Sequence, residues 1–266
     1  MIAEQYRYSN CEAGIQLIFF GDIKLIYVLA SFKKEIAYLL DIVKIRGKKR
    51  FEKRTYYNCE LDDENFYIVK TGLGQKSVPK NTELFKDCSL ILSTGFCGAL
   101  VSDLKNGDLV ISKSIISISN KDAYNSIVKG EKIGEDALIK VEIDNNREMI
   151  DRFVEEITKE NLNVRIFPTF TSPKIVRNKL QKNNLHKITG AYAVDMEDIY
   201  RFNFAKRIGA EFLTVRAVLD EISDDVPGFA DGFKMGQKLT GIISKMDRSA
   251  QAIAVAVEKF IKVLSE

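Results

Sequence analysis

Hydrophobic residues along this chain follow two spacings, one typical of buried strands and one typical of amphipathic helices. Residues 25–31 (LIYVLAS), 89–94 (SLILST) and 212–219 (FLTVRAVL) are short apolar runs of the kind found in strands buried on both faces. We expect further strands at residues 108–118, 164–170 and 191–194. Residues 55–61 and 66–71 alternate and are rich in aromatic side chains, and the acidic turn between them predicts a hairpin.

Helices are indicated where apolar residues recur every three or four positions. After the first strand, this pattern involves Ile36, Leu39, Leu40 and Val43. The C-terminal helix has the clearest pattern, with Ala250, Ile253, Ala254, Val257, Ile261 and Leu264 on one face. We also expect helices at residues 145–160 and 195–208, where Asp195 is suited to capping the second one.

Apolar strands that alternate with helices, together with a hairpin and one long strand, predict an α/β fold. We expect a mixed twisted β-sheet flanked by helices on both sides. We find no linker rich in Gly, Ser or Pro and no internal repeat, so residues 1–266 are interpreted as a single domain, with residues 1–24 as an N-terminal extension. In such sheets the ligand site lies beyond the carboxyl ends of the strands.

Charge excludes little except a dominant role in nucleic-acid binding. The 40 Lys and Arg residues against 37 Asp and Glu leave a net charge of +3, which favours neither nucleic acid nor an anionic membrane. Residues 44–54 form a local basic run. We interpret it as a solvated hairpin edge, because lysines protect edge strands from aggregation; a landing patch for phosphate or anionic lipid is the alternative.

Cysteine and histidine usage restricts the chemistry. The four cysteines are widely spaced, and the chain begins without a secretory signal, so we expect a cytoplasmic protein without disulfides. The apolar stretch at residues 15–20 is far shorter than the roughly 20 residues of a membrane span. His186 is the only histidine, which disfavours Ser-His-Asp triads and zinc sites. We expect no metal and no cofactor, and chemistry that depends on carboxylates.

Candidate site residues follow the predicted strands. Thr94 and Gly95 begin a turn with Gly98 in which backbone amides can approach a ligand, although a tight turn alone needs the same glycines. Gly72-Leu73-Gly74 resembles only the start of a dinucleotide motif. A carboxylate at Glu197 can hold the two hydroxyls of a ribose, or merely favour the helix dipole.

Arg216 and Asp220 share one predicted strand and its end. Their four-residue separation places them on one face, where they form either a structural ion pair or part of a site in which Asp220 is an acid with a raised pKa.

Four motifs in order, STGFCGAL, NGDLVIS, AYAVDMEDIY and FLTVRAVLDE, make residues 25–265 resemble the nucleoside phosphorylase/nucleosidase superfamily. The chain is most similar to methylthioadenosine/S-adenosylhomocysteine nucleosidase and to the hopanoid-associated phosphorylase branch. The resemblance implies cleavage of the N-glycosidic bond of a purine nucleoside, with adenine as the expected base. It also implies a homo-oligomer, either a dimer or a hexamer.

The same resemblance implies a role for each candidate residue. Asp220 would protonate N7 of the departing purine, as a general acid should, and Glu35 would orient the attacking water. Glu197 would hold the ribose hydroxyls. The remaining expected substrate-binding residues are Met196 under the sugar, Thr94 and Gly95 near the ribose and nucleophile, Phe170 and Ser172 beside the base, Arg216, and Phe229 near the 5′ end of the nucleoside.

Two departures from the family pattern affect the choice of reaction and substrate. Leu219 stands where the nucleosidases usually carry a serine, which favours the hopanoid-associated branch and its substrate adenosylhopane. Ser93 stands where hexameric phosphorylases carry an arginine, and Glu35 would repel phosphate. We therefore expect hydrolysis, with a phosphate-dependent phosphorylase and an enzyme acting on adenosylhopane as the alternatives, and a non-catalytic nucleoside-binding protein as a weaker one.

Overall fold

A computed structural model describes residues 25–226 and 236–265, with side chains placed for all of these except Glu135 and residues 236–242. The strands are β1 (Leu25–Ala30), β2 (Lys44–Phe51), β3 (Arg54–Leu61), β4 (Glu64–Lys70), β5 (Cys88–Ala99), β6 (Leu109–Ile118), β7 (Leu138–Glu142), β8 (Val164–Thr171), β9 (Ala193–Asp195) and β10 (Glu211–Asp220). The α-helices are α1 (Ala37–Ile42), α2 (Lys121–Lys129), α3 (Arg147–Lys159), α4 (Lys179–Thr189), α5 (Asp198–Ile208) and α6 (Gly236–Ser265).

All ten strands belong to one mixed sheet that partly closes on itself. The pairing order β10-β6-β8-β9-β5 returns to β10, because β5 also pairs with β10. From β5 the sheet continues as an open arm through β1, β4, β3 and β2, and β7 pairs with β6 at the side. The β1–β5, β5–β10 and β6–β8 pairs are parallel, whereas β2, β3 and β4 form an antiparallel meander.

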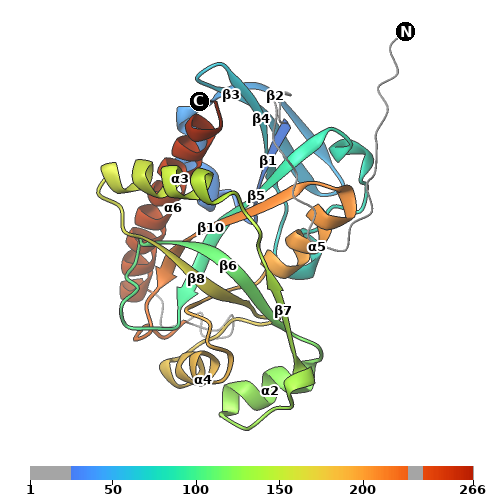
Figure 1. Ribbon diagram of the computed structural model, residues 1–266. Coiled ribbons are helices and arrows are strands. Elements are labelled where there is room, and N and C mark those ends of the chain that lie inside the picture. The colour runs from blue at the N-terminus through green and yellow to red at the C-terminus, as the bar shows by residue number, and fades with distance from the viewer. Residues whose placement is uncertain (1–24, 227–235, 266) are drawn as a thin grey trace.

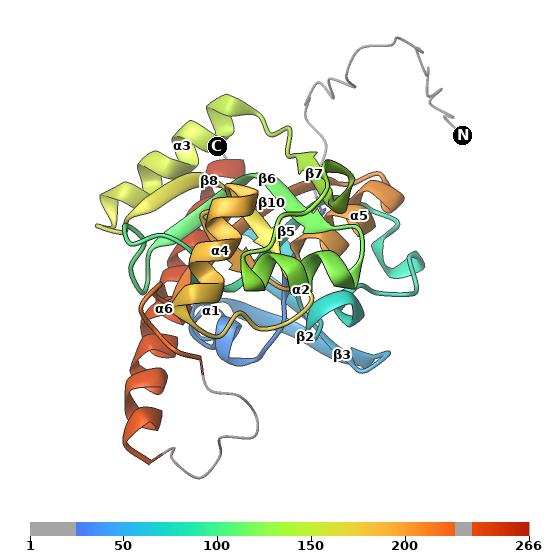
Figure 2. The same ribbon diagram turned by 90° about the horizontal axis from the view of Figure 1, so that it is seen from below.

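Helices cover the sheet on two sides and at one end (Figure 1). The larger core cluster joins one face of the sheet to α1, α3 and α6, and includes Leu39, Phe153 and Phe260. A second cluster joins the opposite face to α5. Seen from below, α2 and α4 lie beside each other under the ring of strands (Figure 2). The predicted fold class, a mixed α/β sheet with helices on both sides, is confirmed.

The middle of β5 is the point where the sheet opens. One side of β5 pairs with β10 from Leu90 to Gly98. On the other side β1 ends opposite Ser93, and β9 begins only at Gly98. In the part of the chain that the structure describes, residues 94–97 therefore have no strand on that side, which leaves backbone groups available to side chains or ligands.

Most sequence-based elements are confirmed, and some are corrected. The prediction that a strand ends at Gly95 is wrong, because β5 continues through both glycines to Ala99. His186 lies in the last turn of α4, where its Nδ1 is 2.8 Å from the Ala191 carbonyl oxygen. Helices α2 and α4 and strand β7 were not expected from the sequence, because their apolar patterns are short.

The basic run lies on an edge strand. Residues 44–51 form β2, which pairs only with β3 among the described strands and is largely exposed. Lys44 and Arg46 pair with Glu60 on β3. The interpretation as a solvated hairpin edge is confirmed for residues 44–51. It is wrong for Arg54, which is buried at the start of β3 and donates to the carbonyl oxygens of Lys76 and Val78.

Candidate active site

Glu35 occupies the gap beside β5. It lies in a 3-10 turn (Lys34–Ile36) just after β1 and is only 2% exposed. Its Oε2 accepts hydrogen bonds from the backbone amides of Ser31 (2.6 Å) and Phe32 (2.8 Å), and its Oε1 accepts one from Phe96 on β5 (3.0 Å). Burial raises the pKa of Glu35 in spite of these amides. The side chain thus takes the place of a neighbouring strand at the sheet opening and brings a carboxylate there.

Glu197 and Arg216 form a second charged contact close to Glu35. Arg216, fully buried on β10, donates through Nη1 to Glu197 Oε2 at 3.3 Å. Glu197 Oε1 accepts from the amide of Gly74 at 2.9 Å, so the loop after β4 also reaches this carboxylate. These two contacts set the orientation of Glu197 without engaging every acceptor position of its two oxygens.

Asp198 is the main partner of Arg216. It accepts hydrogen bonds from Arg216, from Ser93 (2.7 Å) and from Thr214 (2.8 Å), and it is completely buried. Burial favours the neutral form of Asp198, but the charge of Arg216 and these hydrogen bonds outweigh burial and lower its pKa. The pair is therefore a charged structural unit beneath the site.

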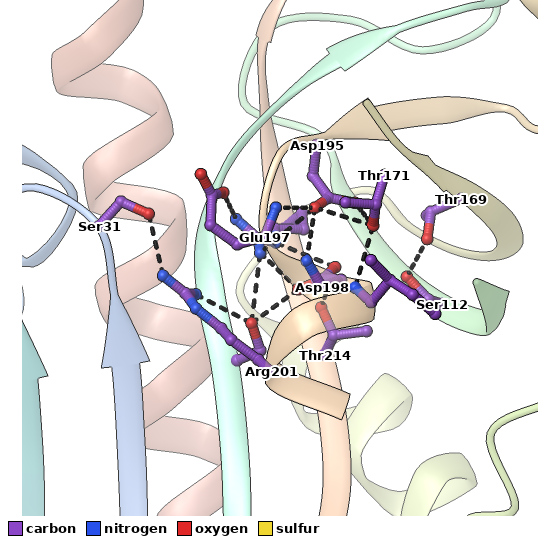
Figure 3. Close-up of polar contacts among 12 residues, drawn as sticks. Ser31, Ser112, Thr169, Thr171, Asp195, Glu197, Asp198, Arg201 and Thr214 are labelled. Carbon is purple, nitrogen blue, oxygen red and sulfur yellow. Dashed lines mark hydrogen bonds and ion pairs between the residues drawn. The ribbon is translucent and has the colours of Figure 1, made fainter. Parts of the chain in front are cut away.

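A second buried arginine, Arg201, extends this network (Figure 3). It donates to the carbonyl oxygens of Leu29 and Thr94 and to the hydroxyls of Ser31, Thr71 and Ser93. It thereby ties the ends of β1 and β4 and the middle of β5 to α5. Since these acceptors are all protein atoms, both arginines near the gap are already engaged within the fold.

Asp195 organises the start of α5. One of its carboxylate oxygens accepts from the backbone amides of Glu197 (2.6 Å) and Asp198 (2.7 Å), while Thr171 donates to the same side chain. The expectation that the helix opens at Asp195 is wrong, because Asp195 ends β9 and α5 begins at Asp198 with Glu197 as its N-cap residue, but the Asp195 carboxylate does cap the free amides at the start of the helix. The cap fixes the backbone that carries both Glu197 and Asp198.

The two glycines of β5 let charged side chains lie directly against the strand. A Cβ on Gly95, whose φ is +142°, would lie 2.7 Å from Glu35 Oε1 and 2.9 Å from Arg216 Nη1. A Cβ on Gly98 would lie 2.8 Å from Asp220 Oδ2. Glu35 and Asp220 therefore both lie against β5, at glycines three residues apart.

Asp220 ends β10 and has its own partner. Lys182 on α4, which is fully buried, places Nζ 2.7 Å from Asp220 Oδ2. Burial raises the pKa of Asp220, and Lys182 opposes that shift. A register shift between Val218 and Asp220 interrupts the alternation of β10. The expected common face of Arg216 and Asp220 is therefore not maintained, and the two side chains have different partners.

Three other candidate residues, Thr94, Ser172 and Met196, are buried or half-buried. Thr94 is buried within β5, and its hydroxyl has no hydrogen-bond partner among the described residues. Ser172 is also buried and donates to the Lys174 carbonyl oxygen in the loop that leads to α4. Met196 is half-buried beside Glu197.

Phe170 lies in a core cluster away from these charged side chains. Phe170 is fully buried in a cluster with Tyr124, Val176 and Leu185, so its contact with a base stays a prediction. Phe229 lies outside the described residues.

Sequence reasoning missed Asp198, Arg201 and Lys182. Asp198 and Arg201 were visible only as residues of an expected helix, and their burial is set by how α5 packs on β5 and β10. Lys182 lies in a helix that the sequence did not reveal. A signal existed for Asp198, since it continues the acidic run that begins at Asp195.

The described residues contain no group of three His, Cys, Asp or Glu side chains placed to hold a metal ion.

A mixed sheet with buried carboxylates on either side of a glycine-containing central strand defines an α/β protein with a polar site at the sheet opening. Residues 25–262 match the family model of the Phosphorylase superfamily, and the chain belongs to that superfamily.

Similar proteins cover nearly the whole chain. A 5′-methylthioadenosine/S-adenosylhomocysteine nucleosidase of Staphylococcus haemolyticus is 23% identical over 244 residues, which are 90% of this chain and 100% of the relative. Among solved structures, a Helicobacter pylori nucleosidase mutant of the same name, with 5′-methylthioadenosine in its active site, matches with a TM-score of 0.71 and 14% identity, covering 90% of this chain and 98% of its own. Futalosine hydrolase of Helicobacter pylori matches with a TM-score of 0.68 and 15% identity over the same shares. These structural matches show the fold.

Proposed function

We propose that this chain hydrolyses the N-glycosidic bond of a purine nucleoside and releases the free base, with adenine as the favoured base. The observation that carries the proposal is the placement of Glu35 and Asp220 against Gly95 and Gly98 of one strand, with the Arg216–Glu197 pair also close to Gly95. The names of the relatives, which are nucleosidases of adenine nucleosides, support the same class of substrate.

In the proposed reaction each carboxyl group has a separate task. Glu35 takes a proton from a water molecule, whose oxygen bonds to C1′ of the sugar. The C1′–N9 bond breaks, its electron pair moves onto the purine, and Asp220 donates a proton to N7. Glu197 holds the ribose hydroxyls, and Arg216 keeps Glu197 in place. Carboxyl pairs of this kind are how proteins stabilise the cationic sugar that forms as such a bond breaks.

The charge distribution supports water over phosphate as the nucleophile. Phosphate sites in proteins depend on cationic or amide donors that are free to bind its oxygens. Here Arg216 is held by Asp198 and Glu197, Arg201 is held by protein oxygens, and Ser93 is bonded to Asp198. The amides of Ser31, Phe32 and Phe96 donate to the Glu35 carboxylate, so they are not free to bind phosphate.

The test measures base release by the full chain from methylthioadenosine, S-adenosylhomocysteine, inosine and adenosylhopane, with and without phosphate. In water enriched in ¹⁸O, hydrolysis places the label on the released sugar. Asp220→Asn and Glu35→Gln should be nearly inactive, whereas exposed Glu131→Gln should retain full activity. Base release only when phosphate is present would establish a phosphorylase instead, and binding without turnover across the panel would establish a nucleoside-binding protein.

Assembly and location extend the same proposal. A homo-oligomer, either a dimer or a hexamer, is supported by exposed apolar side chains on the outer surface, among them Leu180 (67% exposed), Ile139 and Ile166. Light scattering of the wild-type chain and of Leu180→Asp would test it.

A cytoplasmic location is supported by the free, buried state of Cys59, Cys88 and Cys97. None of the helices in the described ranges has the length and apolarity that crossing a bilayer requires.

A further inference from the structure

Lys182 is a buried cation aimed at the end of β10. Its side chain is completely inaccessible, and Nζ contacts Asp220 Oδ2 (2.7 Å), the Glu221 carbonyl oxygen (2.5 Å) and the Asp224 carbonyl oxygen (3.1 Å). An ammonium group has three donor hydrogens, so these three acceptors saturate it. The group therefore holds one oxygen of Asp220 in a fixed direction.

The position of Lys182 is otherwise unfavourable. A buried charge costs several kcal/mol of desolvation. In addition, Lys182 lies in the first turns of α4, which begins at Lys179, where the helix dipole disfavours a cation. An apolar residue would pack there at lower cost, as Leu185 does one turn later. The contact with Asp220, which becomes an ion pair when that carboxyl group ionises, is the interaction that offsets these costs.

The surroundings of Asp220 leave Lys182 as its cationic partner. Leu219 has no hydroxyl to offer, and its carbonyl oxygen is occupied by Asn106. The ionisable groups around Asp220 in the described structure include Asp224, which is itself paired with Lys245 of α6, Cys97 on β5, and the neighbouring Glu221, which is paired with Lys105. Asp220 retains 22% side-chain exposure, and its Oδ1 has no part in the Lys182 contact.

We propose that Lys182 is a positioning residue for Asp220. The Lys182 ammonium holds Asp220 Oδ2, so that the carboxyl group presents Oδ1 to the purine, and it stabilises the carboxylate left after proton transfer. This inference rests on the proposed function. In the step concerned, the Asp220 O–H bond breaks, its proton bonds to N7 of the departing base, and the resulting negative charge on Asp220 lies beside the Lys182 ammonium. Lys182 keeps all its protons throughout.

Removing the charge should make Asp220 a weaker acid. An opposite charge at this distance lowers the pKa of a carboxyl group by about one to three units. Without Lys182 the pKa of Asp220 therefore rises further, and the alkaline limb of the kcat profile moves to higher pH by about one unit or more. Because proton donation by a general acid contributes about 10²- to 10⁴-fold, kcat for a nucleoside should fall by about 10-fold or more while KM changes little.

The experiment compares Lys182→Met, Lys182→Arg and the matched control Lys187→Met, whose lysine is exposed on the same helix. Each full-length variant is assayed on the best nucleoside of the panel and on a nitrophenyl riboside, whose leaving group departs without protonation. Lys182→Met should lose activity on the nucleoside alone, Lys182→Arg should recover part of it, and Lys187→Met should match the wild type. Equal losses on both substrates, or an unmoved alkaline limb, would overturn the proposal.

A second measurement does not depend on turnover. The carboxyl carbon signal of Asp220, assigned by its loss in Asp220→Asn, can be titrated by ¹³C NMR in the wild type and in Lys182→Met. A higher pKa in the variant supports the role of Lys182, and an unchanged pKa contradicts it. If Lys182→Met fails to fold by circular dichroism, Lys182→Gln takes its place. A wild-type chain that cleaves no nucleoside overturns the proposed function, while the titration still reports on the ion pair.

Discussion

Glu35 Oε1 lies 2.7 Å from the point that a Cβ atom on Gly95 would occupy. This closeness exists because β1 ends before Gly95, and the Glu35 side chain bonds to the Phe96 amide in place of a strand. The absence of a side chain at Gly95 therefore leaves the space that the buried Glu35 carboxylate occupies.

Gly95→Ala should abolish activity. Its φ of +142° is unfavourable for any residue with a Cβ, and the added atom would meet both Glu35 and Arg216. Displacing Glu35 by about 1 Å is enough to reduce turnover by about 100-fold, and backbone strain should cost about 1–3 kcal/mol of unfolding free energy. Kinetics and urea unfolding measure the two effects separately.

Gly190→Ala is the matched control for Gly95→Ala. It also has a positive φ, of +72°, but no atom lies within 4 Å of its Cβ position. It should lose about 1–2 kcal/mol of stability and retain activity. Similar kinetics in both variants would show that contact with Glu35 is unimportant.

Glu197→Gln should reduce discrimination between nucleosides that have and lack a ribose 3′-hydroxyl. Hydrogen bonds to a charged group contribute about 1.5–3 kcal/mol, so the wild type should prefer the natural sugar by about 10- to 100-fold in kcat/KM. In the variant this preference should shrink, because the neutral amide is a weaker acceptor. A preference that is unchanged would remove Glu197 from the sugar site.

The activity should follow a bell-shaped dependence on pH. Burial raises the pKa of Glu35, and a base must be ionised, so activity should fall as pH decreases through that raised pKa. Burial also raises the pKa of Asp220, and an acid must be protonated, so activity should fall as pH increases through its pKa. Steady-state kinetics from acid to alkaline pH test both limbs. The acid limb should be absent from the residual activity of Glu35→Gln, and a wild-type profile without either limb would contradict both roles.

Asp198→Asn should destabilise the fold strongly. It leaves Arg216 buried without its main partner, and breaking a buried pair costs about 3–5 kcal/mol. Since the pKa of Asp198 is lowered in the folded state, its stabilisation is present above the ordinary aspartate pKa and is lost as pH falls through the lowered one. The difference from wild type in unfolding free energy should therefore shrink in acid.

Asp151→Asn is the control for Asp198→Asn. Asp151 pairs with Arg147 on the exposed face of α3, where screening makes such pairs weak. Its removal should change the unfolding free energy by less than about 0.5 kcal/mol. Equal effects in the two variants would show that the buried pair has no special role.

Much of the fold could be predicted from local patterns. The buried strands β1, β5 and β10 are apolar runs, and α3 and α6 have clear helical periodicity, so their positions follow from spacing alone. The short helices α2 and α4 were not predicted, because each buries few apolar residues, although an asparagine N-cap and a glycine C-cap bound both of them. The ring of pairings from β10 back to β5 has no local signature, because it joins strands that are distant in the sequence.

The sequence by itself determined which side chains are available for chemistry and that Glu197 and Asp220 follow strands, because these features depend only on residue type and local periodicity. Tertiary structure alone decided the partners: Asp198 for Arg216, Lys182 for Asp220, and the Phe96 amide for Glu35. Each of these contacts joins residues between 18 and 61 positions apart. Such contacts arise from strand order and helix packing, which the spacing of residues within one segment does not contain.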